Sequence, residues 1–217
     1  MTMDIKKTYD FSDICAVVTG GAGVLCAEMC RAIASLGAKV AILDLNPINS
    51  KKLANEIREK GGTAIGVACN VLDKESVQAA CDLVLESFGK VDILINGAGG
   101  NKAQATTSTD LPFFDLSVDA LRWVFELNLL GTILPSQVFG KEMAKQGQGN
   151  ILNISSMNAF RPLTRIPAYS AAKAGVSNFT QWLAVHLAQE YSANIRVNAI
   201  APGFFVKIGR ASCRERV

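Results

Sequence analysis

The stretch ICAVVTGGAGVLCAEMCRAIASLG, residues 14–37, decides the fold of this chain. Residues 14–19 are an apolar run rich in β-branched side chains, typical of a buried strand. Gly20-Gly21-Ala22-Gly23 follows, and residues 24–36 then place apolar side chains at helical spacing up to Gly37. Such a turn leaves backbone N–H groups bare at a helix N-terminus, where a pyrophosphate is attracted by the donors and by the helix dipole. A glycine turn that merely connects strand to helix is the alternative.

Five further apolar runs alternate with helical patterns along the chain. The runs cover residues 39–43, 63–68, 91–95, 150–155 and 195–201, and the helical patterns cover residues 47–60, 73–88, 118–146 and 169–191. Gly131 and Pro135 are expected to bend the longest of these helices. Wholly apolar strands that alternate with helices predict a parallel sheet covered on both faces. The sequence therefore predicts a single doubly wound α/β domain, a Rossmann fold.

Ligands of such sheets bind at the carboxyl ends of the strands. The glycine-rich turn, Asp44, residues 96–100, Ser156 and Pro202-Gly203 should all meet there. Asp44 could accept both ribose hydroxyls of an adenosine, and its charge would repel a 2′-phosphate. No Arg or Lys lies in the turn or just after Asp44 to offset that repulsion, so NAD is favoured over NADP. An aspartate that only caps the following helix is the alternative.

Tyr169 and Lys173 are four residues apart in the stretch SMNAFRPLTRIPAYSAAK, residues 156–173. In a helix they share one face, one turn apart. An ammonium close to a phenol favours the phenolate, and lowering the phenol pKa by about three units takes roughly 4 kcal/mol. Ser156, at the end of an apolar run, could bond the same substrate oxygen. By itself the Tyr–Lys spacing also fits a solvated helix face.

Two arginines, Arg161 and Arg165, lie in the loop between the serine and the tyrosine. This loop should pass the substrate, and a guanidinium binds a carboxylate with two parallel hydrogen bonds. Asn101, Lys102 and Asn158 could add polar contacts. Arginines that only face solvent are the alternative.

Composition limits the remaining possibilities. The chain has 217 residues, of which 49% are hydrophobic, yet no run approaches the roughly 18–20 apolar residues of a membrane span. Residues 1–13 lack the apolar core of a signal peptide, so a cytoplasmic protein is expected. The six cysteines form no CxxC pair and have no histidine at metal spacing, so no metal site is expected. Five of them lie mostly on apolar faces or beside strands, which predicts buried thiols at Cys15, Cys26, Cys30, Cys69 and Cys81. The one histidine, His186, lies in the middle of a helix and indicates core or interface.

The last eleven residues differ from the rest of the chain. They hold four of the 22 basic residues and one of the 19 acidic ones, so the net charge of +3 belongs to them alone and a nucleic-acid partner is not expected. Residues 208–217 resemble the translation of a sequencing-library adapter; a natural Arg-rich terminus is the alternative. We therefore expect residues 1–206 to form one incomplete NAD-binding domain, truncated after the sixth strand, and residues 207–217 to be a non-native tail.

Together these residues resemble the short-chain dehydrogenase/reductase family over residues 11–206. The resemblance implies that Tyr169 is the acid/base, that Lys173 lowers its pKa and holds the nicotinamide ribose, and that Ser156 polarises the carbonyl. Asn128, in ELNLLG, would anchor a proton-relay water. The resemblance implies cofactor contacts at Gly20, Gly23, Val24, Leu25, Asp44, Asn70, Val71, Asn96, Ala98, Gly99, Tyr169, Lys173, Pro202 and Gly203.

Three positions depart from the family pattern. Cys26 replaces the last glycine of the turn, and Gly97 replaces the second asparagine of Asn-Asn-Ala-Gly. Asn70 replaces the usual adenine-binding aspartate. The Cys26 thiol is expected to crowd a place where backbone and helix pack closely, which would weaken cofactor binding.

The motifs TGGAGVL and INGAGGN, with residues 155–186, are most similar to the branch of D-mannonate oxidoreductases, also called fructuronate reductases. That branch implies a keto-uronate substrate and a homodimer or homotetramer, with Asn101, Asn158, Arg161 and Arg165 as substrate contacts. Another sugar or polyol dehydrogenase, such as a gluconate 5-dehydrogenase, is the alternative. A nucleotide-binding regulatory protein and an inactive fragment are two further alternatives.

Overall fold

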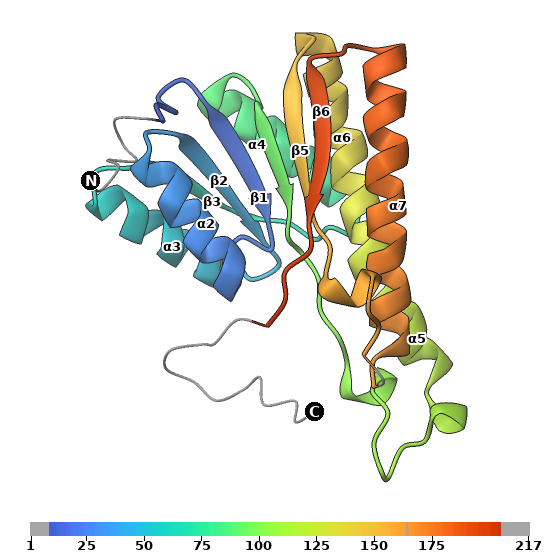
Figure 1. Cartoon of the computed structure of the whole chain (residues 1–217). Helices are drawn as coiled ribbons and strands as arrows, with labels where there is room; N and C mark the ends of the chain where they lie inside the picture. Colours follow the sequence, from blue (N-terminus) through green and yellow to red (C-terminus); the bar gives the residue numbers. More distant parts are fainter. Residues whose placement is uncertain (1–8, 164, 205–217) are drawn as a thin grey trace, which may run out of the picture.

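The computed structural model describes residues 9–163 and 165–204 of the chain (Figure 1). Within them, six strands form one sheet in the order β3-β2-β1-β4-β5-β6. The strands are β1 (Cys15–Thr19), β2 (Lys39–Asp44), β3 (Thr63–Ala68), β4 (Ile93–Asn96), β5 (Gly149–Ile154) and β6 (Ile195–Ile200). All neighbouring pairs are parallel, so the six carboxyl ends share one edge, the lower one in Figure 1. The predicted doubly wound sheet is confirmed.

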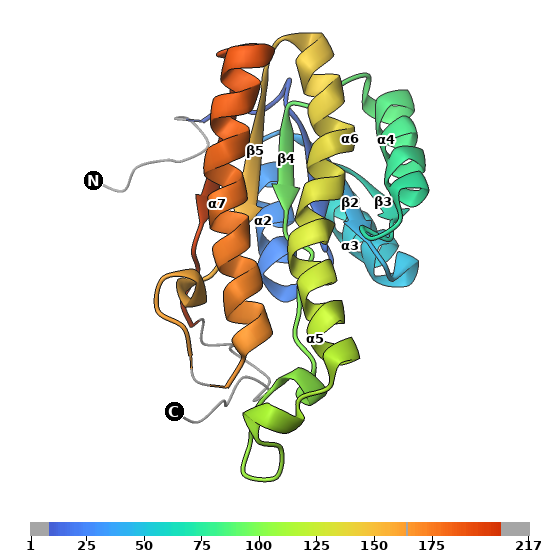
Figure 2. The ribbon, with the colours of Figure 1, turned by 90° about the vertical axis from the view of Figure 1, so that its right-hand side faces the viewer.

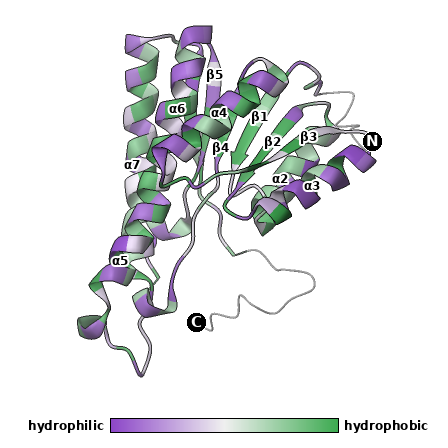
Figure 3. Ribbon diagram, turned by 180° about the vertical axis from the view of Figure 1, so that it is seen from behind, coloured by the Kyte–Doolittle hydropathy of each residue, from purple (hydrophilic) through white to green (hydrophobic). Residues whose placement is uncertain are grey.

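Helices cover both faces of this sheet (Figures 1 and 2). One face carries α2 (Val24–Ser35) and α3 (Pro47–Glu59), and the other carries α4 (Lys74–Phe88), α6 (Gly131–Gln146) and α7 (Pro167–Glu190). Successive strand residues alternate between two cores: Val17 packs with the α4, α6 and α7 side, and Val18 with the α2 and α3 side. Both are fully buried, which contributes about 1.5–3 kcal/mol each. Figure 3 shows the resulting contrast between hydrophobic strands and hydrophilic outer helix faces.

Polar residues and glycines set the helix boundaries. Asn46 caps α3 by accepting two backbone N–H groups, with Pro47 in the first turn, and Asp73 caps α4 in the same way. Gly89 and Gly147 end α4 and α6 in the left-handed conformation, with φ of +81° and +72°. These local signals explain why the boundaries expected from the sequence lie within a few residues of the observed ones.

The long helical pattern is interrupted at a different place than expected. Between α5 (Val118–Phe125) and α6, residues Glu126–Leu130 form a π turn, whereas Gly131 and Pro135 both lie within α6. The Asn128 side-chain amide donates to the Val124 carbonyl at 2.8 Å, the acceptor that an α-helix would give to the backbone N–H of Asn128. The wider turn is therefore attributed to this side chain. Helix α5, which precedes the turn, lies beyond the edge of the sheet (Figure 2).

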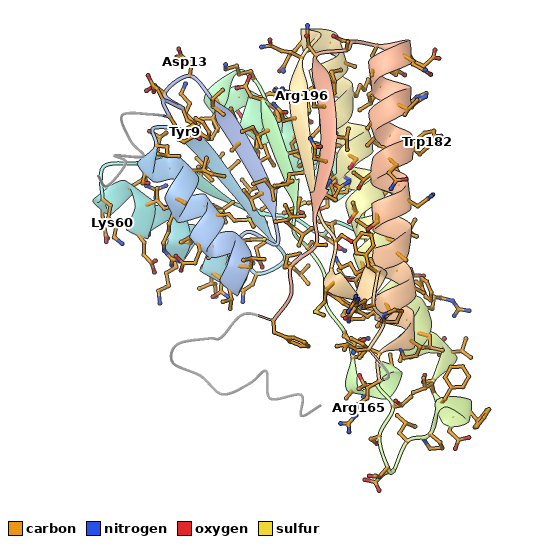
Figure 4. All side chains as sticks on the ribbon, viewed as in Figure 1. Tyr9, Asp13, Lys60, Arg165, Trp182 and Arg196 are labelled. Carbon is orange, nitrogen blue, oxygen red and sulfur yellow. The ribbon has the colours of Figure 1, made fainter. Side chains whose placement is uncertain are left out.

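Strand β6 is an edge strand within the described residues. Its face on the α2 side is exposed at Arg196 and Asn198, and Arg196 is labelled beside this strand in Figure 4. A cavity of about 500 Å³ opens there, at the end of the strands opposite the predicted site, and is lined by Ile14, Asp92, Gln148, Gly149, Asn150, Ala193, Asn194 and Arg196. The tail for which an adapter origin is expected, residues 207–217, lies outside the described residues.

Candidate active site

The strand register places three polar residues side by side at the carboxyl edge. Thr19 of β1 pairs with Asn96 of β4, and Asn96 pairs with Asn153 of β5. All three are buried. Because neighbouring parallel strands end together here, loops that are far apart in the sequence meet at this edge, as expected for a doubly wound sheet.

The glycine-rich turn is built to approach a neighbouring loop closely. Gly20 has φ of +59°, and a Cβ there would lie 2.8 Å from the Ala98 Cα. Gly23 is the N-cap residue of α2 and supplies no side-chain cap, and Val24 after it is 58% exposed. The first N–H groups of α2 are therefore open to an anionic group.

Thr19 joins this turn to the loop after β4, a role that the sequence reasoning missed. Its Oγ1 accepts hydrogen bonds from the backbone N–H groups of Gly97 and Ala98, at 3.1 and 3.3 Å. The signal in the sequence is slight: one polar residue that ends an apolar strand. The threonine fixes the spacing between the two backbone segments that flank the candidate cofactor site.

Asp44 faces the turn. Its Oδ2 accepts from the Ala22 N–H at 3.1 Å and its Oδ1 from the Asn46 N–H at 3.0 Å. The N-cap residue of α3 is Asn46, so Asp44 bonds the backbone of that residue without being the cap itself. Each carboxylate oxygen keeps a free lone pair, and the half-buried group can accept further hydrogen bonds from a diol.

Cys26 and Gly97 are sterically matched. A Cβ at Gly97 would lie 2.1 Å from the Cys26 Sγ, a distance that atoms cannot adopt, so the thiol occupies the space of the missing side chain. Cys26 is 4% exposed, and burial raises the pKa of its thiol to about 11. The crowding expected from Cys26 is therefore relieved by the second departure from the family pattern, Gly97.

A buried polar network supports the strand ends. The Asn96 Nδ2 donates to the Ser136 Oγ and to the Asn153 Oδ1, both at 2.9 Å, and the Asn153 Nδ2 donates to the Thr180 Oγ1 at 2.9 Å. Asn153 and Thr180 were also missed, because each lies within an otherwise apolar pattern. The Asn96 Oδ1 is buried without a hydrogen-bond partner among the described residues.

The Asn128 side chain forms two hydrogen bonds with the loop after β4. Its Oδ1 accepts from the Gly100 N–H at 3.2 Å, and its Nδ2 donates to the Gly100 carbonyl at 2.7 Å. A Cβ at Gly99 would lie 2.7 Å from the Asn128 Oδ1 and 3.4 Å from the Lys173 Nζ. Gly99, Asn128 and the Lys173 amine therefore share one small space.

Tyr169 and Ser156 are close enough for the serine to influence the phenol. Burial raises the pKa of Tyr169 above its usual value, and a hydrogen bond with the Ser156 hydroxyl acts in the opposite direction. The Ser156 Oγ also accepts from the Asn158 N–H at 3.2 Å, which fixes the serine at the start of the short helix η4 (Met157–Ala159). The two groups that the sequence placed on one substrate oxygen are thus within hydrogen-bond reach of each other.

Lys173 does not contact the Tyr169 hydroxyl in the way the sequence suggested. Its ammonium donates to the Ile154 carbonyl at 2.7 Å and lies 5.7 Å from the centroid of the Tyr169 ring. Burial lowers the pKa of Lys173 to about 8, and the nearby Cys26 thiol opposes this shift. The Tyr169 pKa is raised by desolvation of the phenol, and Lys173 is not among the groups that shift it, contrary to the expected lowering by that ammonium.

The remaining candidate cofactor contacts surround the same edge. Asn70 is exposed, and its Oδ1 accepts from the Leu72 N–H at 3.1 Å. Val71 is buried against the α4 and α6 side of the core. Pro202 accepts a hydrogen bond from the Met157 N–H at 3.0 Å, which ties the chain after β6 to the Ser156 loop.

The candidate substrate residues differ in burial and in hydrogen bonding. Asn158 is 3% exposed, and its Oδ1 has no partner among the described residues. The Asn101 Nδ2 donates to the Thr106 Oγ1 at 2.8 Å. Arg161 and Arg165 are exposed, and Figure 4 shows Arg165 on a loop at the lower end of the molecule.

These residues fit a nicotinamide dinucleotide, which supplies or accepts a hydride when bound. The open N-terminus of α2 suits a pyrophosphate, Asp44 suits a ribose diol, and Lys173 with Asn128 lies further along the same edge. Across residues 9–163 and 165–204, no group of side chains is arranged to hold a metal ion and no helix is long and apolar enough to cross a bilayer.

Comparisons with known proteins agree with this geometry. The chain matches the short chain dehydrogenase family over residues 14–214. It is 46% identical to an uncharacterized oxidoreductase of Haemophilus influenzae, over 94% of this chain and 74% of the relative. It is 48% identical to the uncharacterized oxidoreductase UxuB of Bacillus subtilis, over 88% of this chain and 70% of the relative.

Solved structures share the fold, and two that contain bound NAD resemble this chain over most of its length. A crystal structure with bound NAD, of a Haemophilus influenza protein provisionally named a D-mannonate oxidoreductase, is 45% identical with a TM-score of 0.88, covering 94% of this chain and 75% of that one. An NAD⁺-bound xylitol dehydrogenase is 32% identical with a TM-score of 0.82, covering 89% and 71%. The chain therefore belongs to the short-chain dehydrogenase family and is a nicotinamide-dependent oxidoreductase.

Proposed function

We propose that this oxidoreductase interconverts a keto-uronate and an aldonate, with fructuronate and D-mannonate as the pair. The observation that carries the chemistry is the convergence of Tyr169, Ser156, the buried Lys173 and Asn128 at one edge of the sheet. The structure that bears the D-mannonate name supports the choice of substrate, since its sequence is 45% identical.

Each side chain has a distinct role in the proposed reaction. In the reductive direction the Tyr169 hydroxyl gives its proton to the carbonyl oxygen while the carbonyl carbon gains the hydride, and in the oxidative direction it takes the proton back. Ser156 donates a hydrogen bond to the same oxygen and stabilises the charge that develops there. Lys173 adds a positive charge over the tyrosine ring, and Asn128 anchors a proton-relay water.

The proposed cofactor is NAD in preference to NADP. Asp44 lies against the glycine-rich turn, where a 2′-phosphate would meet a negative charge. The proposed cofactor contacts are the fourteen residues that the family resemblance implies, of which Gly20 is the first and Gly203 the last. The NAD bound in two related structures supports the dinucleotide itself.

Purified protein, assayed by the loss of NADH absorbance, tests the substrate. D-fructuronate should be reduced with a kcat/KM at least tenfold above that for D-fructose, which lacks the carboxylate. Equal rates for the two sugars would remove the acidic substrate from the proposal. The proposed contacts Asn101, Asn158, Arg161 and Arg165 are tested in the same assay by single substitution to Ala, or to Met for the arginines.

A polyol or neutral sugar dehydrogenase is the second candidate. The 32% identity to a xylitol dehydrogenase favours it, because that protein acts on an uncharged polyol. NAD⁺ reduction with xylitol or D-mannitol in place of D-mannonate distinguishes the two candidates, since only the second accepts an uncharged alcohol efficiently.

A second copy of the chain is the proposed partner. The exposed face of α7 between Pro167 and Gln189 carries no charged residue, and Trp182 and Val185 are 57% and 56% exposed on it. The rings of Trp182 and His186 stack at 4.8 Å, and Figure 4 shows Trp182 on the outer side of the helix. An uncharged face that exposes a tryptophan and a valine supports an interaction site here. Trp182→Glu should convert a homodimer or homotetramer to smaller species in sedimentation velocity.

Two proposals concern context. Cytoplasmic location is proposed because the five described cysteines are buried free thiols. We also propose that residues 1–206 are the native part of an incomplete NAD-binding domain and that residues 207–217 are a non-native tail. The genomic sequence past codon 206 tests it, and the same eleven residues followed by a stop codon would contradict it.

A further inference from the structure

In the loop that follows β4, Lys102 is positioned both by a contact of its side chain and by hydrogen bonds of its backbone. Its Nζ lies 4.1 Å from the centroid of the Trp123 ring, well within the range of a cation–π interaction. Its backbone carbonyl accepts from the Ala105 N–H at 3.0 Å and from the Thr106 Oγ1 at 2.9 Å. Both the ammonium and the backbone that carries it therefore have a defined position.

This position borders the candidate active site. Trp123 packs against a small apolar cluster of Ala105, Ala120, Val124 and Ala168, and Tyr169 packs against the same cluster. On the other side, Gly100 is bound to Asn128 through both its N–H and its carbonyl. Lys102 is thus two residues from a backbone segment that contacts the Asn128 side chain, and its ring partner shares a cluster with the acid/base.

The charge of Lys102 is uncompensated. It is half-buried, and within residues 9–163 and 165–204 no carboxylate forms an ion pair with it. Arg161 and Arg165 differ from it, since both are exposed. A fixed, partly desolvated cation binds a carboxylate more strongly than a mobile, fully hydrated one.

We propose that Lys102, held over the Trp123 ring, binds the carboxylate of the substrate and determines the preference for an acidic over a neutral sugar. This inference rests on the proposed function, because it assigns the group that recognises the acid. It predicts that Lys102 contributes more to this preference than either arginine. A lysine that merely covers the indole ring with its methylenes is the competing explanation.

Lys102→Met separates these two explanations. The methionine chain still covers the Trp123 ring but carries no charge. We expect KM for D-fructuronate to rise at least tenfold, with kcat and the KM for a neutral ketose changed less than twofold. Lys102→Arg should restore most of the affinity, and Lys141→Met, on the exposed side of α6, should change neither constant. If Lys102→Met leaves the KM for the acid unchanged, or raises both KM values equally, the inference is wrong.

Fluorescence tests the anion site without turnover. In a Trp182→Phe background, Trp123 is the only indole, and its emission should respond to a ligand that engages the ammonium above it. Sodium D-gluconate should cause a saturable change, whereas sorbitol and sodium chloride should not, and Lys102→Met should abolish the change. A gluconate response that survives Lys102→Met, or no response at all, contradicts the inference. Failure of D-fructuronate turnover together with a Lys102-dependent response would overturn the proposed substrate and retain the anion site.

Discussion

Replacing Gly97 by Ala should destabilise the protein through a single contact. The new methyl group would lie 2.1 Å from the Cys26 Sγ and 2.9 Å from the Thr19 carbonyl oxygen. Gly97 does not have a positive φ, so the cost is steric and not conformational. Overpacking of a tightly filled site costs about 1–3 kcal/mol, and the very short contact to sulfur places this case near 3 kcal/mol.

The same substitution should be far better tolerated when the thiol is absent. In a Cys26→Ala background only the contact to the Thr19 carbonyl remains, and we expect a cost of about 1 kcal/mol. Cys26→Ala alone should cost about 1 kcal/mol through the small cavity that it leaves. The double-mutant cycle should therefore give a coupling energy of about 2 kcal/mol.

Urea denaturation of the four proteins measures this cycle, and NADH titration shows whether the cofactor site is affected in parallel. Gly140→Ala is the matched control, since its methyl group would meet nothing closer than the Ile151 Cδ1 at 3.7 Å. That variant should be as stable as the parent or slightly more so. If Gly97→Ala costs the same in both backgrounds, within about 0.5 kcal/mol, the proposed matching of Cys26 and Gly97 is refuted.

Substitutions at Tyr169, Asp44 and Lys173 should each have a distinct effect. Tyr169→Phe should lower kcat by several orders of magnitude while NADH still binds, and near-normal turnover would exclude Tyr169 as the acid/base. Asp44→Ala should narrow the preference for NADH over NADPH; equal kcat/KM for both cofactors in the parent enzyme would contradict the role of Asp44. Lys173 holds a buried ammonium whose pKa falls from 10.5 to about 8, so it destabilises the fold below pH 8, and this penalty disappears as the pH rises toward 10.5. Lys173→Met should therefore increase the free energy of unfolding at pH 7. The gain is up to about 3 kcal/mol, reduced by the loss of the hydrogen bond to the Ile154 carbonyl, and it should shrink between pH 8 and 9.5 when stability is measured by urea titration. A gain in stability that is constant with pH would show that the buried charge is not its cause.

The sequence determined the architecture because its signals are local. The apolar runs, the capping residues such as Asn46 and Asp73, and the glycines that end helices each act over a few residues, and together they fix the order of strands and helices. Ligands of parallel sheets bind at the carboxyl ends of the strands, and this rule predicts that Asp44, Ser156 and the glycine-rich turn lie at one edge.

Only the tertiary structure decided how those residues interact. Cys26 and Gly97 are 71 positions apart, and their steric fit depends on how closely α2 approaches the end of β4. The Lys173 ammonium donates to the Ile154 carbonyl. The Tyr169 pKa is raised because the phenol is buried, and its burial depends on the neighbouring elements and not on a four-residue spacing. The contact of Lys102 with Trp123 likewise joins a loop to a helix that begins sixteen residues later. Spacing along a chain predicts which side chains share a helix face, but desolvation and contact across elements are set by three-dimensional packing, which no local pattern encodes.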